Sequence, residues 1–196
     1  MIDERNLDFL YEIGSLRHVP RLWRQYFGID VASDLEHTYR LIWIALMISR
    51  MEKTGDENKI IKMALLHDIA ETRTSDHTHL QKNYVQINEE KAADDIFKDT
   101  IVSDYRDVLR EYEDRQSIEA KIVKDADNLD IDLELKEFED QGSKIPAKWA
   151  QNRRLVRDEK LYTESARKLW DAIQTSNPND WHMKSNRWLD NPRAGK

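Results

Sequence analysis

The segment from Ser33 to Lys53 constrains the fold more than any other part of the chain. It opens with Ser-Asp-Leu-Glu, a capping box in which Ser33 and Glu36 satisfy backbone N–H groups at a helix start. The residues from Leu41 to Met47 are then apolar on nearly every side, and Gly55 follows the segment. A helix that is apolar all round is normally buried by other elements. The segment therefore predicts a central helix around which the rest of the chain packs.

Helical spacing of apolar residues recurs along most of the remaining chain. It predicts further helices over residues 2–13, 58–71, 88–98, 104–112, 117–138 and 160–174. We expect loops or short turns between these segments, and no segment has a convincing strand pattern. With only 5 Gly and 4 Pro, the chain also lacks the many tight turns of a sandwich or barrel. The sequence thus predicts an all-α fold in a single domain over residues 1–196, with 176–196 as an irregular C-terminal tail.

Charge and cysteine content limit what the protein can bind. Its 31 Lys and Arg against 38 Asp and Glu give a formal net charge of −7, which argues against a broad surface for a nucleic acid polymer. No apolar run is long enough to span a membrane, and the charged N-terminal residues are unlike a signal peptide. We therefore expect a soluble cytoplasmic protein. Because the chain has no cysteine, any metal must be held by histidine, carboxylates or water.

Four polar residues occupy positions where the helical pattern predicts buried or cleft-facing side chains: His37, His67, Asp68 and Asp127. Ionisable groups are costly to bury unless they are paired or bound to a cation. Two imidazoles and two carboxylates suit a divalent metal ion such as Co, Mn, Ni, Zn or Fe. Each residue also has a plainer interpretation when taken alone. His37 could cap a helix or lie at the surface, and Asp127 could belong to a solvated acidic face.

The order His37, His67-Asp68, Asp127 resembles the H…HD…D signature of the HD-domain metal-dependent phosphohydrolases. The similarity is greater to the 5′-deoxynucleotidase-like branch, through the stretches LRHVPRLW, SDLEHTYRL, MALLHDIAE and EYEDRQSIEAKIVKDADNL. This resemblance covers about residues 16–129. It implies an all-α HD-domain bundle with a metal site between central helices, in which His37, His67, Asp68 and Asp127 are the metal ligands. It also suggests a homodimer, as do the apolar residues near the C-terminus.

The resemblance implies roles for four more residues. Glu71 matches the glutamate of HD-x-x-E and would orient a metal-bound water, whereas Asp76 matches a loop aspartate that handles the proton of the departing 5′ oxygen. Arg21 matches an arginine that binds the substrate phosphate, a task suited to the planar guanidinium. Trp23 would be an adjacent aromatic residue that stacks on a base. Three of these residues also have a structural interpretation. Glu71 could be an exposed charge at the end of a helix, and Asp76 could cap the segment that follows it. Arg21 could form an ion pair at the surface.

The loop after Glu71 departs from the family pattern. Ser75 stands before Asp76 where the family usually has glycine, so the proton-transfer role of Asp76 depends on the conformation of this loop. His77 and His79 add an H-x-H pair beside the predicted site. These histidines fit an exposed loop, extra substrate contacts or an added metal ligand.

The resulting functional hypothesis is a phosphohydrolase. It would remove phosphate from nucleoside 5′-monophosphates, small-molecule substrates, by attack of a water that the metal acidifies. Two alternatives remain open from the sequence. One is an HD-type phosphodiesterase or a nucleotide or alarmone pyrophosphohydrolase, because the same metal site serves these reactions. The other is a nucleotide-binding sensor without turnover.

Overall fold

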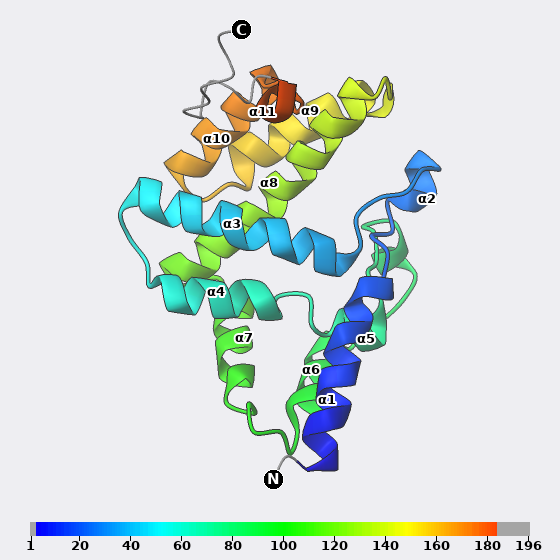
Figure 1. The fold of residues 1–196 in the computed structure, drawn as a ribbon, viewed down its shortest axis with the longest axis vertical. Coiled ribbons are helices and arrows are strands. Elements are labelled where there is room, and N and C mark those ends of the chain that lie inside the picture. Colours follow the sequence, from blue (N-terminus) through cyan, green and yellow to red (C-terminus); the bar gives the residue numbers. More distant parts are fainter. Residues whose placement is uncertain (1–2, 184–196) are drawn as a thin grey trace, which may run out of the picture.

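The computed structural model describes residues 3–183, and every regular element within them is helical (Figure 1). In chain order these are α1 Glu4–Gly14, the 3-10 helix η1 Ser15–His18, α2 Arg24–Phe27, α3 Asp34–Glu52, α4 Glu57–Leu66, α5 Glu71–Thr74, the 3-10 helix η2 Gln81–Asn83, α6 Glu89–Phe97, α7 Tyr105–Asp114, α8 Ile118–Asp140, α9 Ile145–Glu159, α10 Glu164–Thr175 and α11 Asp180–Met183. The only β-type pairing in this range is an isolated bridge between Pro20 and Ser33. The predicted all-α class is confirmed.

The predicted capping box and central helix are both present in α3. The Ser33 hydroxyl accepts a hydrogen bond from the Glu36 amide, and the Glu36 carboxylate accepts one from the Ser33 amide. α3 crosses α8 in the middle of the molecule, with α4 and α10 packed beside them (Figure 1). Leu41, Ala45 and Ile48 are fully buried in this core. The crossing fixes where side chains from the first turn of α3 and the middle of α8 meet.

The predicted helix over residues 58–71 is wrong at its C-terminal end. α4 ends at Leu66, and the amides of Ile69 and Glu71 then bond three residues back instead of four. The His67 ring explains the break, because its Nδ1 donates to the Ala64 carbonyl at 2.8 Å. In a continued helix that carbonyl would accept from the amide four residues on. Glu71 therefore begins a separate short helix, α5, and does not lie one turn after His67 in the same helix.

Two differences occur in the C-terminal third. The segment expected as a loop between residues 139 and 159 contains α9, whose second residue is Pro146. Proline is tolerated in the first helical turn, where no amide partner is required. In the predicted tail, Asp180–Met183 forms the short helix α11, and residues 184–196 lie outside the described range. The extent of the single domain over 1–196 stays a prediction.

Within residues 3–183, none of the helices combines the length and the apolar character that crossing a membrane requires.

Candidate metal centre

The four predicted metal ligands meet where α3, α8 and the end of α4 come together. His37 projects from the first turns of α3 and Asp127 from the middle of α8, whereas His67 and Asp68 lie just after α4. The two Nε2 atoms of His37 and His67 are 3.3 Å apart. The carboxylates of Asp127 and Asp68 approach to 3.3 Å from His37 Nε2 and 2.9 Å from His67 Nε2 respectively. Residues 90 positions apart in the sequence thus share one small polar cluster.

The hydrogen bonds of both imidazoles leave their Nε2 atoms available to a cation. His37 Nδ1 donates to Asp130 at 2.6 Å, and His67 Nδ1 donates to the Ala64 carbonyl. In the neutral tautomers these bonds select, two Nε2 lone pairs face each other across 3.3 Å. Such an arrangement is repulsive unless a proton or a metal ion lies between the nitrogens. Outer hydrogen bonds of this kind are usual for metal-binding histidines, so the residues present fit a divalent metal.

Without a metal, charge in the cluster is balanced by a proton on His37. Burial and the nearby Arg21 oppose that proton, but Asp127 and Asp130 outweigh them and raise the pKa of His37 to about 9. Burial likewise opposes ionisation of Asp127, yet Lys124, whose Nζ lies 2.5 Å from Oδ2, and His37 hold its pKa well below the usual range. Asp68 is similar, because His67 lowers its pKa against the effect of burial. The carboxylates are therefore ready to bind a cation near neutral pH.

A second group of carboxylates adjoins the first. Oxygen atoms of Asp34, Asp68 and Glu71 lie within 4.8 Å of one another. Asp34 is fully buried, and its carboxylate shares a hydrogen bond with the carboxyl group of Glu71. Burial, together with the charges of Asp68 and Asp34, raises the pKa of Glu71 to about 11; burial also raises that of Asp34 to about 6. In the metal-free chain Glu71 therefore holds a proton next to the predicted ligands.

Arg21 and Asp76 close the other side of the cluster. Arg21 Nη1 lies 3.8 Å from Asp68 Oδ2, and its Nε lies 3.8 Å from Asp76 Oδ2. Asp76 Oδ2 accepts a hydrogen bond from the Leu22 amide at 2.9 Å, which ties the loop after α5 to the segment before α2. That segment is anchored to the start of α3 by the bridge between Pro20 and Ser33. The structure therefore brings both residues to the cluster.

Trp23 and the loop histidines lie less directly at the site. The Trp23 ring is buried against Phe27 and Trp149, with centroids 5.6 and 6.0 Å away, while the Arg21 guanidinium lies 5.8 Å from its centroid. Trp23 thus supports Arg21, and base stacking by Trp23 stays a prediction. His77 bonds to the carbonyl of Ser75, and His79 is exposed. Neither belongs to a metal-binding group found within residues 3–183.

Ser75 adopts a backbone conformation that glycine normally occupies. Its φ and ψ are 61° and 160°, a region that side chains rarely enter. The loop therefore reaches Asp76 through a glycine-type turn even though serine replaces glycine.

Sequence reasoning missed three residues that contact the predicted ligands or lie among them. Asp130 binds the His37 ring and is itself held by Arg40, Lys124 pairs with Asp127, and Asp34 lies beside Glu71. Asp130 follows Asp127 by three residues, so helical spacing was a usable signal. Lys124 precedes Asp127 by the same interval. Asp34 gave no such signal, because an acidic residue in the first turn of a helix is ordinary.

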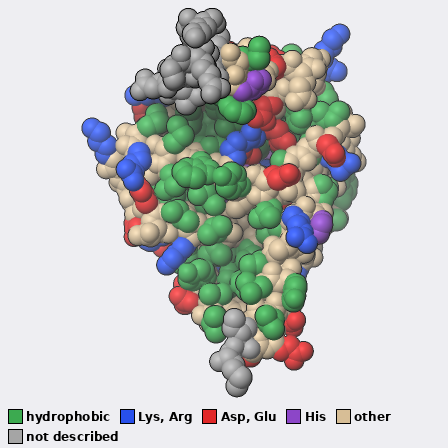
Figure 2. Space-filling model, in the orientation of Figure 1, with side chains coloured by type: hydrophobic (Ala, Val, Ile, Leu, Met, Phe, Trp, Pro, Cys, Tyr) green, Lys and Arg blue, Asp and Glu red, His purple; other side chains and the backbone are tan. Residues whose placement is uncertain are grey.

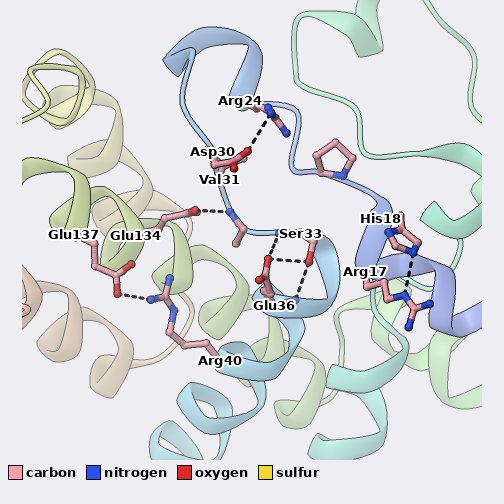
Figure 3. Close-up of a pocket in the computed structure, with 12 residues that line it drawn as sticks. Arg17, His18, Arg24, Asp30, Val31, Ser33, Glu36, Arg40, Glu134 and Glu137 are labelled. Atoms are coloured by element: carbon pink, nitrogen blue, oxygen red, sulfur yellow. Dashed lines mark hydrogen bonds and ion pairs between the residues drawn. The ribbon is translucent and has the colours of Figure 1, made fainter. Parts of the chain in front are cut away.

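A cavity of about 610 Å³ lies beside the start of α3 (Figure 3). Its lining includes Arg17, His18, Arg24, Arg40, Glu134 and Glu137. Arg40 connects this cavity to the metal cluster, because its guanidinium donates to both Asp130 and Glu137. The guanidinium of Arg40 is thus occupied by carboxylates.

Comparisons with known proteins show the family and the fold. The family model described as HD domain matches residues 13–172. A protein of Mus musculus named 5′-deoxynucleotidase HDDC2 is 30% identical over 145 residues, covering 70% of this chain and 72% of the relative. Its namesake from Dictyostelium discoideum is 28% identical over 160 residues, covering 72% and 82%. A conserved hypothetical protein of Pyrococcus furiosus superposes with a TM-score of 0.72 at 25% identity, covering 86% and 98% of the two chains.

Proposed function

The chain belongs to the HD domain family, and from this membership we propose that it is a 5′-deoxynucleotidase, which releases phosphate from deoxyribonucleoside 5′-monophosphates. The observation that carries the proposal is the pair of facing Nε2 atoms of His37 and His67, bordered by Asp68 and Asp127. A divalent metal held by these four residues supplies Lewis-acid stabilisation of the phosphoryl oxygens and acidifies water. Co, Mn, Ni, Zn and Fe all remain candidates.

We assign phosphate binding to Arg21. Its side chain donates no hydrogen bond to any residue between 3 and 183, and both of its carboxylate neighbours are 3.8 Å away. The guanidinium donors are therefore free to form a bidentate contact with a phosphate group. Its position over Trp23 limits the orientations the guanidinium can take. Arg21 would thus fix the phosphate beside the metal ligands and stabilise charge that develops on its oxygens.

We assign proton transfer to Glu71 and Asp76. The raised pKa of Glu71 keeps a proton on it in the metal-free chain, and Asp76 accepts a hydrogen bond from the Leu22 amide and lies 3.8 Å from Arg21. Hydrolysis of a phosphate ester needs one group to accept a proton from water and one to protonate the leaving 5′ oxygen. Two carboxyl groups at different positions beside the predicted ligands can divide these tasks.

The proposal is tested on protein stripped of metal and reloaded with Co or Mn. We expect phosphate release from deoxynucleoside monophosphates, lost in His67→Ala and retained in His182→Ala, a control at an exposed histidine of α11. Turnover only of phosphodiesters or alarmones would contradict the proposal and assign the site to those substrates. Nucleotide binding without release, with every metal tried, would make the protein a sensor.

The homodimer and the cytoplasmic location expected from the sequence belong to the same proposal. Both the location and the homodimer stay predictions.

A further inference from the structure

The cavity beside the start of α3 is lined by charged residues of both signs, most of which are paired within the cavity wall. The paired residues are Arg24 with Asp30, Arg40 with Glu137, and Glu36 with Ser33. Figure 2 shows charged side chains of both signs toward α2, beside the hydrophobic surface over α3. Arg17 and one oxygen of Glu134 have no such partner within residues 3–183. These two groups are therefore free to bind a ligand.

Glu134 places a buried hydrogen-bond acceptor in the wall of the cavity. Its side chain projects from α8, and the residue is only 5% exposed. The Oε1 atom accepts a hydrogen bond from the Ala32 amide at 2.9 Å, whereas Oε2 has no partner within residues 3–183. A buried acceptor without a partner raises the free energy of the folded protein. A ligand with an N–H group directed at Oε2 would remove that cost.

Arg17 supplies positive charge at another part of the same cavity. Its Nε donates to His18 Nε2 at 3.0 Å, and no carboxylate within residues 3–183 forms an ion pair with its guanidinium. Figure 3 shows Arg17 and His18 on the opposite side of the cavity from Glu134, with Ser33 between them. A guanidinium with free donors binds phosphate oxygens well. The cavity thus separates a site for an anion from a site for an N–H donor.

The rest of the cavity suits a flat organic group between these two sites. Its lining includes the apolar residues Pro20, Val31 and Ala32. The volume of about 610 Å³ lies in the range of cavities that bind cofactors and other small molecules. It exceeds what a free amino acid would fill. A nucleotide combines the three features that the cavity requires: an anionic group, a flat ring and an N–H donor at the far end of the ring.

We propose that this cavity is a second nucleotide site, separate from the metal centre, for a nucleoside monophosphate whose base carries an amino group. Arg17 binds the phosphate, and the amino group of the base donates to Glu134 Oε2. The four acidic residues of the lining favour a single phosphate group over a triphosphate, because they repel additional negative charge. An inorganic anion alone would leave Glu134 Oε2 without a partner.

The second site adjoins the metal centre without overlapping it. Glu134 follows Asp127 by seven residues, so the two lie two turns and about 10 Å apart along α8. The wall between the sites is the segment that carries Arg21. The Ala32 carbonyl accepts a hydrogen bond from the Arg21 amide at 3.3 Å, while the Ala32 amide donates to Glu134. A ligand held by Glu134 therefore stabilises the backbone that positions Arg21.

The first test is calorimetric titration of the metal-stripped, full-length chain with adenosine 5′-monophosphate. We expect saturable binding of one nucleotide per chain. Glu134→Gln should weaken binding about 10- to 100-fold, because it removes a charged acceptor. The glutamine oxygen still accepts from the Ala32 amide, so the fold is retained. Glu139→Gln is the matched control, at an exposed residue of α8 outside the cavity, and should bind as the unmodified chain does.

The phosphate and base ends are tested separately. Arg17→Ala should weaken binding, whereas Arg154→Ala, at an exposed arginine of α9 outside the cavity, should not. Purine riboside 5′-monophosphate lacks the amino group and should bind the unmodified chain as weakly as adenosine 5′-monophosphate binds Glu134→Gln. Inorganic phosphate should bind more weakly than either nucleotide.

Hydrogen exchange locates the bound nucleotide. Adenosine 5′-monophosphate should slow exchange at the amides of Arg21 and Ala32. Phosphate release from deoxynucleoside monophosphates by metal-loaded Glu134→Gln and Arg17→Ala should match that of the unmodified chain, because neither residue lies in the metal centre. This result keeps the second site distinct from the proposed activity.

Three results would overturn the inference. The first is the absence of binding at millimolar nucleotide. The second is equal affinity for adenosine 5′-monophosphate and purine riboside 5′-monophosphate, because Glu134 would then not contact the base. The third is binding that Arg21→Ala abolishes, with slowed exchange confined to residues 67–76. That outcome would place the nucleotide at the metal centre.

Discussion

The metal centre has two sides built in different ways. On the helix side, His37 and Asp127 project from the long helices α3 and α8, and partners on α8 hold them: Asp130 for His37 and Lys124 for Asp127. On the break side, residues 67–76, the chain leaves α4 and forms turns before and after the four-residue helix α5. The helix side fixes ligand positions through buried ion pairs. The break side instead brings carboxyl groups to the cluster from a separate direction.

This contrast matches the chemistry required of each side. The two ligands on the helix side, His37 and Asp127, keep a fixed geometry because regular helices lock their rotamers, whereas the other two, His67 and Asp68, belong to the break side. Glu71 and Asp76 must reach different atoms of a substrate, and a continued α4 would have stacked Glu71 directly above His67. The break separates the two residues, so Glu71 joins Asp34 and Asp68 instead. The irregular backbone between α4 and α5 thus places Glu71 among the carboxylates of Asp34 and Asp68.

The largest effect is expected where the helix side loses its support. Asp130→Asn keeps the shape of the side chain but removes the charge that holds the His37 ring, so we expect metal affinity to fall about 10- to 100-fold. Asp132→Asn is the matched control, since Asp132 is equally buried on α8 but pairs with Arg153. Calorimetric titration of the stripped proteins measures both. Equal losses in the two variants would mean that Asp130 acts through general stability.

A smaller effect should follow pH. Binding of a metal by His37 must displace the proton that its raised pKa of about 9 retains, so apparent affinity should rise about tenfold per pH unit up to that value. The metal-free chain should show the reverse trend in stability. The stabilisation from His37 is fully present below the ordinary pKa of 6.5 and is lost as pH rises through about 9.

The break side has a wider pH window, which contains that of His37, so a substitution is needed to separate the two contributions. The raised pKa of Glu71 gives stabilisation that is complete below 4.5 and declines as pH rises toward 11. Glu71→Gln should remove this part of the pH dependence and leave the part due to His37. Thermal melting of the metal-free protein across pH measures both contributions.

The prediction for His37 is tested by the affinity for metal. A metal affinity that does not change with pH would show that His37 binds no proton in the metal-free protein.

The smallest effect concerns the backbone of the break side. Ser75→Gly should stabilise the protein by about 1 kcal/mol, because glycine enters the conformation at φ 61° without strain. Ser103→Gly, at an exposed turn residue without positive φ, should be slightly destabilising. Urea unfolding of the two variants distinguishes them. Destabilisation by Ser75→Gly would indicate that the serine side chain, and not the backbone, maintains the loop.

Sequence patterns predicted the helix side better than the break side, for physical reasons. The apolar core of α3 and α8 has strong helical periodicity, so spacing alone predicted His37 and Asp127 at core-facing positions of two helices, whereas the meeting of those helices at one site was implied by the resemblance. The end of α4 depends on a side-chain hydrogen bond from His67 to Ala64, which periodicity does not encode. α9 was missed because Pro146 was interpreted as a loop residue, although a proline one residue after Ile145 is compatible with a helix start.

Partner residues were harder to predict than ligands. Asp130 and Lys124 share the face of Asp127, yet only the packing of α3 against α8 shows which of the acidic residues in KDADNLDID meets His37. The exposure of Tyr39, Trp43 and Met47 on α3 was likewise hidden in the sequence. An apolar residue that is exposed and one that is buried look identical in a hydrophobicity pattern.

The imidazole of His67 joins the end of α4 to the cluster, since Nδ1 caps the Ala64 carbonyl while Nε2 faces His37. Any local opening that frees residues 67–75 must therefore break both contacts at once. A bound ion would oppose that opening, and the amides of Ile69 and Glu71 would exchange their hydrogens with solvent more slowly. Hydrogen exchange at these amides would then show whether a metal is bound, although the measurement observes only the backbone and needs no substrate.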